Sequence, residues 1–199
     1  MTAPRDTAPH GANLDAFLRP ESIAVIGAAR SAHKLGRRAL NQLWAHDFSG
    51  VVHPVNPNTA QLQCARSYPS VSDIPGTVDL AVIAVPTGRV LAAVESCADA
   101  GVKAVLVMSP GFGTAQREGA ELNRHLRALA RRADLCLIGP GSLGIVNLAP
   151  EIRMVLTSAP TIPAPGAMSI VVQCGGFAAQ VLEAAATHPI GLRSFVSLG

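Results

Sequence analysis

Residues 22–36 read SIAVIGAARSAHKLG, and this stretch decides the fold. Its first part is a mostly apolar run of strand length that ends at Gly27, and a segment of helical period begins near Leu35. A strand that passes through glycine into a helix is typical of α/β folds, and the free N–H groups at the start of such a helix favour an anion. The turn matches neither G-x-G-x-x-G nor the G-K-[ST] ending of a P-loop. It therefore predicts an anion-binding turn and leaves the ligand open.

Apolar runs of strand length alternate with helical segments along the following chain. This alternation is typical of a parallel sheet covered by helices on both faces, so we expect a Rossmann-like, doubly wound α/β fold. The expected strands lie near residues 22–27, 51–55, 80–85, 104–108 and 135–138. The expected helices lie near residues 35–46, 88–100 and 115–133.

Every expected strand ends at a turn residue. These ends are Gly27, Asn56-Pro57, Pro86, Pro110-Gly111 and Gly139-Pro140. In an open parallel sheet they lie along one edge, where doubly wound folds bind their ligands. Any one glycine or proline can serve only to end its strand. All five together predict a crevice that backbone atoms line.

A second, shorter α/β pattern follows a proline-rich stretch. Residues 154–165 read MVLTSAPTIPAP, which is typical of an edge strand followed by a linker. A strand near 167–172, a helix near 177–186 and a strand near 194–198 then form one β-α-β unit, which buries little core alone. The predicted division is a disordered tail over 1–13, a first domain over 14–150, an edge strand and linker over 151–166, and the start of a second, flavodoxin-like α/β domain over 167–199.

The composition excludes several classes of protein. Of 199 residues, 49% are hydrophobic and 15% are charged, as in a folded domain. The apolar runs are far shorter than the ~20 residues of a membrane-spanning helix. The net charge of +3 is small and the cations are dispersed, so no nucleic-acid surface is visible. The short apolar runs predict a soluble protein. The four cysteines are widely spaced and form no C-x-x-C pair, so we expect the reducing cytoplasm as its compartment.

The residues around the turn bear on the choice of nucleotide. A domain that binds NAD normally has Asp or Glu at the end of its second strand, where residues 53–58 read HPVNPN. Four cations near the turn suit the phosphates of a 3′-phosphorylated adenosine, although two of them also suit an exposed helix surface. They are Arg30, Lys34, Arg37 and Arg38. NADP needs similar charges and therefore stays open as the ligand. An NADP-dependent oxidoreductase is disfavoured by the lack of a catalytic tyrosine, because the only tyrosine, Tyr68, lies in an expected turn.

Eight short segments, in order, carry a family resemblance. They are residues 17–28 (FLRPESIAVIGA), 54–57 (PVNP), 68–71 (YPSV), 79–86 (DLAVIAVP), 111–112 (GF), 138–140 (IGP), 173–176 (QCGG) and 195–199 (FVSLG). On these segments the chain resembles the CoA-binding domain of the NDP-forming acyl-CoA synthetases, the group that includes the succinyl-CoA synthetase α subunit. The resemblance spans nearly the whole chain after residue 14.

The resemblance implies coenzyme A as the ligand, bound at the strand ends, and no metal. The residues expected to bind CoA are Gly27, Ala28, Ala29, Arg30, Ser31, Lys34, Leu35, Gly36, Asn56, Pro57, Val85, Pro86, Ser109, Pro110, Gly111, Phe112, Gly139 and Pro140. A remnant of a phosphate loop is expected at Gln173, Cys174, Gly175 and Gly176.

The family's reaction converts acyl-CoA, phosphate and ADP or GDP into the acid, CoA and the nucleoside triphosphate. It passes through a phosphohistidine, which the resemblance places beyond residue 199. We therefore expect a protein that is incomplete alone, and that needs an ATP-grasp β-type subunit or a further C-terminal segment.

Three departures from the family pattern support an alternative function without catalysis. Asn58 stands where the family usually has lysine, Gly141-Ser142 stands where it has Asn-Cys, and Val172 and Cys174 replace two serines. These changes preserve ligand binding better than chemistry, so we expect no catalytic residue in this chain. A non-catalytic module that senses CoA or acyl-CoA is the alternative function.

Other candidate chemistry has less support. The six histidines show neither metal-ligand nor acid-base spacing. Cys174 begins an expected helix, whose dipole would lower the pKa of a thiol, yet a small buried residue has the same pattern. Ser142 lacks the G-x-S-x-G motif of a hydrolase nucleophile.

Overall fold

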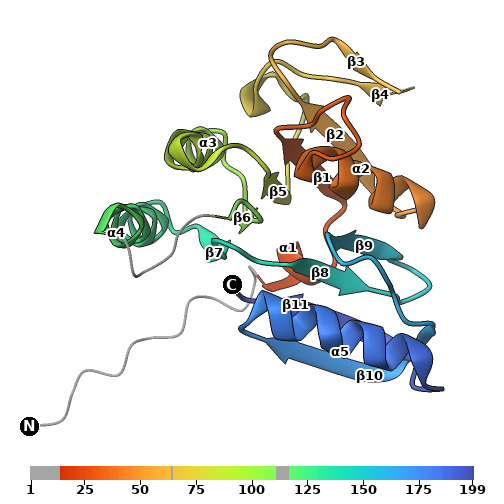
Figure 1. The fold of residues 1–199 in the computed structure, drawn as a ribbon. Helices are drawn as coiled ribbons and strands as arrows, with labels where there is room; N and C mark the ends of the chain where they lie inside the picture. The colour runs from red at the N-terminus through yellow and green to blue at the C-terminus, as the bar shows by residue number, and fades with distance from the viewer. Residues whose placement is uncertain (1–13, 64, 111–116) are drawn as a thin grey trace, which may run out of the picture.

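The computed structural model describes residues 14–63, 65–110 and 117–199. Its first sheet has five parallel strands in the order β2-β1-β5-β6-β7 (Figure 1). These strands are β1 (Ser22–Ile26), β2 (Val51–Val55), β5 (Leu80–Ile83), β6 (Ala104–Val107) and β7 (Cys136–Ile138). The five predicted strands and the doubly wound α/β class are confirmed.

Helices cover both faces of the first sheet. One face carries α3 (Val90–Asp99) and α4 (Arg117–Arg132), and the other carries α2 (Leu35–Ala45) and the short α1 (Leu14–Leu18) (Figure 1). Every residue of β5 and β6 is buried, because side chains that alternate across a covered sheet find core on either side. This two-sided burial explains why these strands are continuous apolar runs in the sequence.

A second sheet of four strands follows, in the order β10-β11-β8-β9. It is built from β8 (Gly144–Asn147), β9 (Met154–Thr157), β10 (Pro165–Val172) and β11 (Leu192–Ser197), with α5 (Gly175–Thr187) between the last two. The expected β-α-β unit is present, and the β8–β9 hairpin extends it through the antiparallel pair β11–β8. The chain passes from the first sheet to the second between β7 and β8.

The two sheets pack against each other through one shared cluster of buried side chains. Ile145 of β8, with Met154 and Leu156 of β9, packs in the same cluster as α2 and the first sheet. Arg38 Nη2 of α2 also donates to the Ser158 carbonyl oxygen after β9 at 2.5 Å. Because apolar packing and hydrogen bonds both cross the junction, the second sheet is fixed against the first.

A small hairpin interrupts the connection from β2 to β5. Its strands are β3 (Gln61–Leu62) and β4 (Ala65–Arg66), and the 3-10 turns η2 (Val71–Asp73) and η3 (Thr87–Arg89) complete the minor elements. The side chain of Leu62 is buried, whereas Gln61 and Gln63 are exposed. Tyr68 N donates to Pro54 O at 2.9 Å and holds the base of the hairpin against β2.

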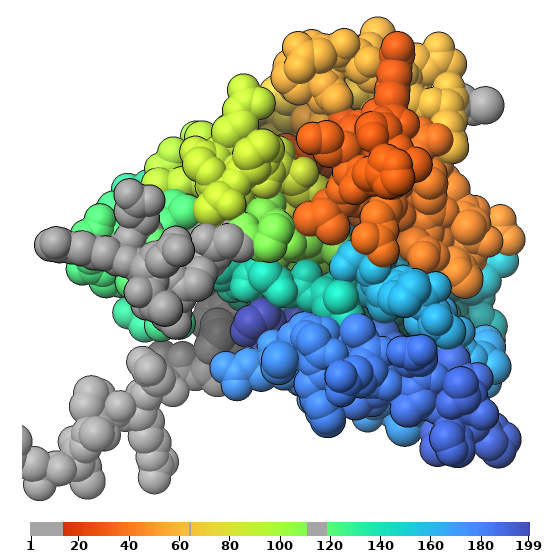
Figure 2. All heavy atoms as spheres, viewed as in Figure 1, coloured from red at the N-terminus to blue at the C-terminus, as the bar shows by residue number. Residues whose placement is uncertain are grey.

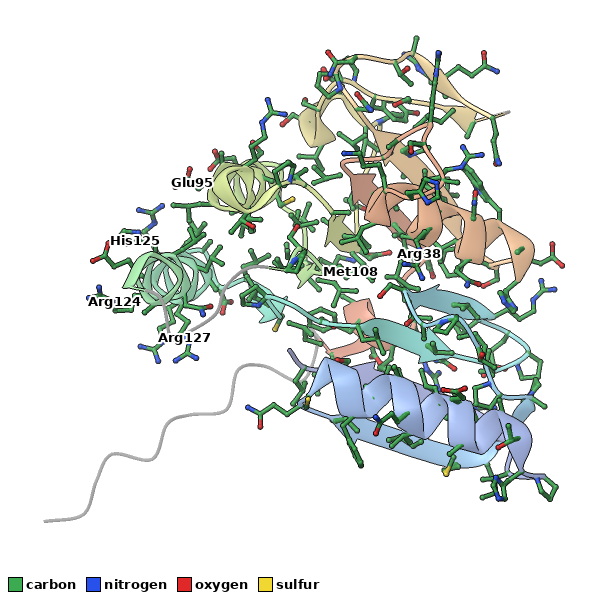
Figure 3. The ribbon with its side chains drawn as sticks, viewed as in Figure 1. Arg38, Glu95, Met108, Arg124, His125 and Arg127 are labelled. Carbon is green, nitrogen blue, oxygen red and sulfur yellow. The ribbon has the colours of Figure 1, made fainter. Side chains whose placement is uncertain are left out.

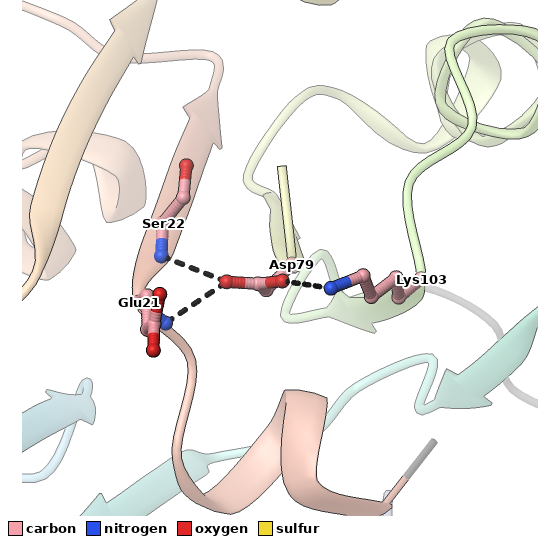
Figure 4. Close-up of polar contacts among 4 residues, drawn as sticks. All are labelled: Glu21, Ser22, Asp79 and Lys103. Carbon is pink, nitrogen blue, oxygen red and sulfur yellow. Dashed lines mark hydrogen bonds and ion pairs between the residues drawn. The ribbon is translucent and has the colours of Figure 1, made fainter. Parts of the chain in front are cut away.

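The amino-terminal edge of the first sheet has a separate polar anchor (Figure 4). Asp79 Oδ2 accepts hydrogen bonds from the backbone nitrogens of Glu21 at 2.9 Å and Ser22 at 3.1 Å. Asp79 Oδ1 accepts from Lys103 Nζ at 2.6 Å. The carboxylate thus ties the starts of β1, β5 and β6 together, at the edge opposite the strand ends. In the described part of the chain, no helix has the length and apolarity to span a bilayer.

Candidate ligand-binding rim

The carboxyl ends of the five parallel strands form one edge of the first sheet, here called the rim. It comprises the residues that follow these strands: 27–36, 56–58, 84–87, 108–110 and 139–142. From β1 the chain goes to β2 on one side and returns to β5 on the other, so the order reverses between β1 and β5. Such a switch point is where open α/β sheets bind ligands.

Two glycines let backbone segments approach closely at this switch point. A Cβ on Gly27, whose φ is +90°, would lie 2.5 Å from Ala84 O. A Cβ on Gly36 would lie 2.2 Å from Gly27 O. The turn from β1 is therefore pressed against both the end of β5 and the first turn of α2. Only glycine fits these two positions.

The middle of the turn between them, residues 30–34, is exposed and electropositive. Arg30, Ser31 and Lys34 are exposed, and Lys34 occupies the N-cap position of α2. The first turn of α2 contains no acidic residue. Its free N–H groups and its cations favour an anion such as a phosphate. We call residues 27–36 the phosphate turn.

A pocket of about 440 Å³ lies beside the phosphate turn. It is lined by Arg30, Arg37, Gln61 and Gln63. In Figure 2 the phosphate turn and α2 (orange) lie against the hairpin (amber), the two segments that line this pocket. Sequence reasoning missed the two glutamines, because a hairpin of two-residue strands has no periodic pattern to detect.

The side chains of Asn56 and Ser109 form hydrogen bonds within the protein. Asn56 Nδ2 donates to Ala28 O at 2.5 Å, and Asn56 Oδ1 accepts from Asn58 N at 2.8 Å. The buried Ser109 Oγ donates to Val85 O at 2.6 Å. Both residues were expected to bind CoA, and their side chains hold neighbouring segments of the rim together. Pro57 and Pro86 are exposed, and Val85 is half-buried.

The far end of the rim meets the second sheet. Gly139 N donates to Leu198 O at 2.9 Å, and a Cβ on Gly175 would lie 3.7 Å from Gly141 O. The structure thus brings the expected phosphate-loop remnant, residues 173–176, to the Gly139-Pro140 end of the rim. Ser142 is buried and donates to Ser197 O at 2.5 Å, a structural hydrogen bond across the junction.

Cys174 is the N-cap of α5 and is fully exposed to solvent. Backbone hydrogen bonds from Phe177 and Gly176 lower the pKa of its thiol. Burial instead raises the pKa of the Cys97 thiol to about 12. Cys174 is therefore the more nucleophilic of the two, and the expectation of a small buried residue at this position is wrong.

Two of the expected CoA contacts, Gly111 and Phe112, lie outside the described residues. The other expected CoA contacts all lie on the rim. Arg38 points away from it, toward the second sheet (Figure 3). Within 14–63, 65–110 and 117–199, no cluster of three or more His, Cys, Asp or Glu residues is placed to hold a metal.

Comparison with known proteins assigns the family. A family model described as CoA binding domain matches residues 21–148. The acetate–CoA ligase [ADP-forming] I of Archaeoglobus fulgidus is 38% identical over 186 residues, which are 94% of this chain and 27% of the relative. The α subunit of acetate–CoA ligase [ADP-forming] II of Pyrococcus furiosus is 33% identical, with 94% and 40% covered.

Solved structures give the same result. The dinucleotide-forming acetyl-coenzyme A synthetase 1 of Candidatus Korarchaeum cryptofilum, in complex with phosphate and ADP, superposes with a TM-score of 0.87 at 34% identity. The match covers 94% of this chain and 39% of that one. The chain thus spans between about a quarter and two fifths of the length of these relatives. It belongs to the family of CoA binding domains and is a homologue of the ADP-forming acyl-CoA ligases.

Proposed function

We propose that this chain binds coenzyme A along the rim and forms the CoA-binding part of an ADP-forming acyl-CoA ligase. One observation supports the proposal: the phosphate turn, which follows β1, and the amino terminus of α5, which lies beside the turn after β7, are on the same edge of the sheet, three strands apart. A long ligand with phosphates at one end and a reactive group at the other fits such an arrangement. CoA has this form, and its thioester carries the acyl group.

The phosphates of CoA bind at the phosphate turn in this proposal. The backbone of Gly27 and Gly36 gives close access, while Ser31 and Lys34 supply a hydroxyl and a charge. Val85 and Pro86, at the end of β5, line the path of the pantetheine arm. Asn56 and Ser109 hold the neighbouring segments in place.

The thiol end of CoA reaches the Gly139-Pro140 turn. Three interstrand steps of ~4.8 Å separate β1, which the phosphate turn follows, from β7, so these two points of the rim are roughly 14 Å apart. An extended arm that starts at the phosphate turn therefore ends near Gly139 and the amino terminus of α5. That helix end, with residues 173–176, is suited to an anion such as a carboxylate or a phosphate.

Turnover requires more protein than this chain in our proposal. The reaction is acyl-CoA, phosphate and ADP to acid, CoA and ATP, and the relatives that carry names of this activity are much longer. We assign the missing steps to an ATP-grasp β-type subunit or a further segment. Residues 14–150 would then be the CoA-binding domain, residues 151–166 an edge strand and linker, and residues 167–199 the first part of a second domain. The free cysteines Cys97, Cys136 and Cys174 suit a reducing cytoplasm.

Isothermal titration calorimetry of the purified chain tests the proposal. We expect saturable binding of CoA and no binding of NADPH at the same salt concentration. A folded chain that does not bind CoA would contradict the proposal. Acetyl-CoA is the third ligand of the titration. If the chain binds acetyl-CoA and CoA with different affinities, and no ligase partner gives turnover, the chain is a CoA sensor instead.

A further inference from the structure

The pocket beside the phosphate turn has an unusual composition for a surface hollow. Its lining contains two guanidinium groups, from Arg30 and Arg37, and two neutral amides, from Gln61 and Gln63. No carboxylate lines it. Among the described residues, neither guanidinium takes part in an ion pair with a carboxylate. Two cations therefore face one hollow without a protein counter-charge, which favours a doubly charged anion.

The four side chains come from segments that the fold holds together. Arg30 lies in the phosphate turn and Arg37 in the first turn of α2. The hairpin that carries both glutamines follows the Asn56 turn, and Asn56 Nδ2 is bonded to Ala28 O at 2.5 Å. The pocket thus lies beside the phosphate turn, on the β2 flank of the rim and away from β7. A group attached to an anion at the phosphate turn would lie beside this pocket.

Arg38 does not belong to this pocket, although the sequence groups it with the other cations. Its Nη2 donates to Ser158 O, and its side chain lies between α2 and the second sheet (Figure 3). The structure therefore separates two adjacent arginines by role: Arg37 faces the ligand side of α2, and Arg38 fastens the second sheet.

We infer that Arg30 and Arg37 bind the 3′-phosphate of the CoA adenosine, so that this pocket selects CoA over dephospho-CoA. This inference rests on the proposed function. A phosphomonoester carries a charge of about −1.5 to −2 at pH 7 and offers three acceptor oxygens, which match two planar guanidinium groups. Gln61 and Gln63 are placed to hydrogen-bond the adenine, whose edge pairs well with side-chain amides.

Calorimetry with four ligands tests the inference on the whole chain. The ligands are CoA, dephospho-CoA, 3′,5′-ADP and NADPH, all at fixed low salt. We expect dephospho-CoA to bind at least about tenfold more weakly than CoA, because it lacks charge-assisted hydrogen bonds. We expect 3′,5′-ADP to bind, and NADPH, whose phosphate is on the 2′ position, to bind far more weakly.

Arg30→Gln and Arg37→Gln supply the variants. Each should weaken CoA about tenfold and leave dephospho-CoA unchanged. Arg127→Gln removes the same charge from α4, which covers the opposite face of the sheet from α2 (Figure 3), and should alter neither affinity. Arg30 is exposed in a turn, so its variant carries the test if the Arg37 variant fails to fold.

The outcomes separate this inference from the proposed function. Equal affinity of the unmodified chain for CoA and dephospho-CoA would overturn the inference and leave CoA binding intact. Equal losses of affinity for CoA and for dephospho-CoA in the arginine variants would also overturn the inference. Such losses would show that the substitutions damage the phosphate turn and do not remove a contact to the 3′-phosphate. Absence of CoA binding to the folded, unmodified chain would overturn the proposed function and the inference together.

Discussion

Gly36 and Gly27 pack backbone against backbone: a Cβ on Gly36 would lie 2.2 Å from the carbonyl oxygen of Gly27. The first turn of α2 therefore rests directly on the turn that leaves β1. This contact places the free N–H groups of the helix at the rim, where a phosphate can reach them. The position of the phosphate turn thus depends on the absence of one methyl group.

Replacement of Gly36 by alanine should displace the phosphate turn. Alanine favours a helix by about 1 kcal/mol, but the overpacked contact costs typically 1–3 kcal/mol. We expect a lower melting temperature and at least a tenfold loss of CoA affinity. Gly88→Ala is the matched control, since a Cβ there meets nothing within 4 Å. A Gly36→Ala chain that binds CoA as tightly as the unmodified chain would refute the role given to this contact.

Charge reversal at Lys34 should weaken CoA binding in a salt-dependent way. Lys34→Glu places a carboxylate at the N-cap of α2, beside the proposed phosphate site. The loss of affinity should be large at low salt and should shrink toward 1 M salt, where the screening length is about 3 Å. Arg127→Glu changes the net charge equally and serves as control. Titrations at several salt concentrations check this, and equal losses in both variants would show a non-local effect.

Asp79 should make stability depend on pH at the edge opposite the rim. Burial acts to raise the pKa of Asp79, but the Lys103 hydrogen bond and the Glu21 and Ser22 backbone hydrogen bonds outweigh it and leave the pKa below its ordinary value. The stability that this carboxylate contributes is then present above its ordinary pKa and is lost as the pH falls through the lowered one.

Asp79→Asn should therefore lower the free energy of unfolding by about 1–2 kcal/mol at pH 7 and by much less near pH 2. Lys103→Met should cost less than about 1 kcal/mol, because Lys103 is largely exposed. Urea unfolding curves at the two pH values measure both effects. A penalty for Asp79→Asn that does not change with pH would show that the ionised carboxylate is not the cause.

Cys174 should be the fast-reacting thiol when compared with Cys97. Its lowered pKa gives more thiolate at pH 7.5, whereas Cys97 is buried with a pKa of about 12. Iodoacetamide labelling, mapped by peptide mass spectrometry, should modify Cys174 first. Saturating CoA should slow this modification if the thiol end of the ligand lies at the amino terminus of α5. Labelling of Cys174 at the same rate with and without CoA would contradict that direction of binding.

The sequence allowed prediction of the parallel sheet and most of the rim, because both depend on local signals. The buried runs of β5 and β6 and the turn at Gly27 are visible in consecutive residues. The edge strand β9 was predicted, but its hairpin partner β8 was missed, because nothing local shows that β8 pairs with β11, some 50 residues later. The different roles of Arg37 and Arg38 were also hidden, since they depend on the distant Ser158.

The β3–β4 hairpin lies outside the parallel sheet, and Leu62 is its only buried side chain among the described residues 61–63 and 65–66. Substitutions at Gln61 and Gln63 therefore leave the strand order, the phosphate turn and the α5 end of the rim untouched. In the proposed mode of binding, recognition of the nucleotide end of CoA and recognition of its acyl end then depend on separate segments. In evolution, and in protein engineering, the chain can exchange one preference while it inherits the other.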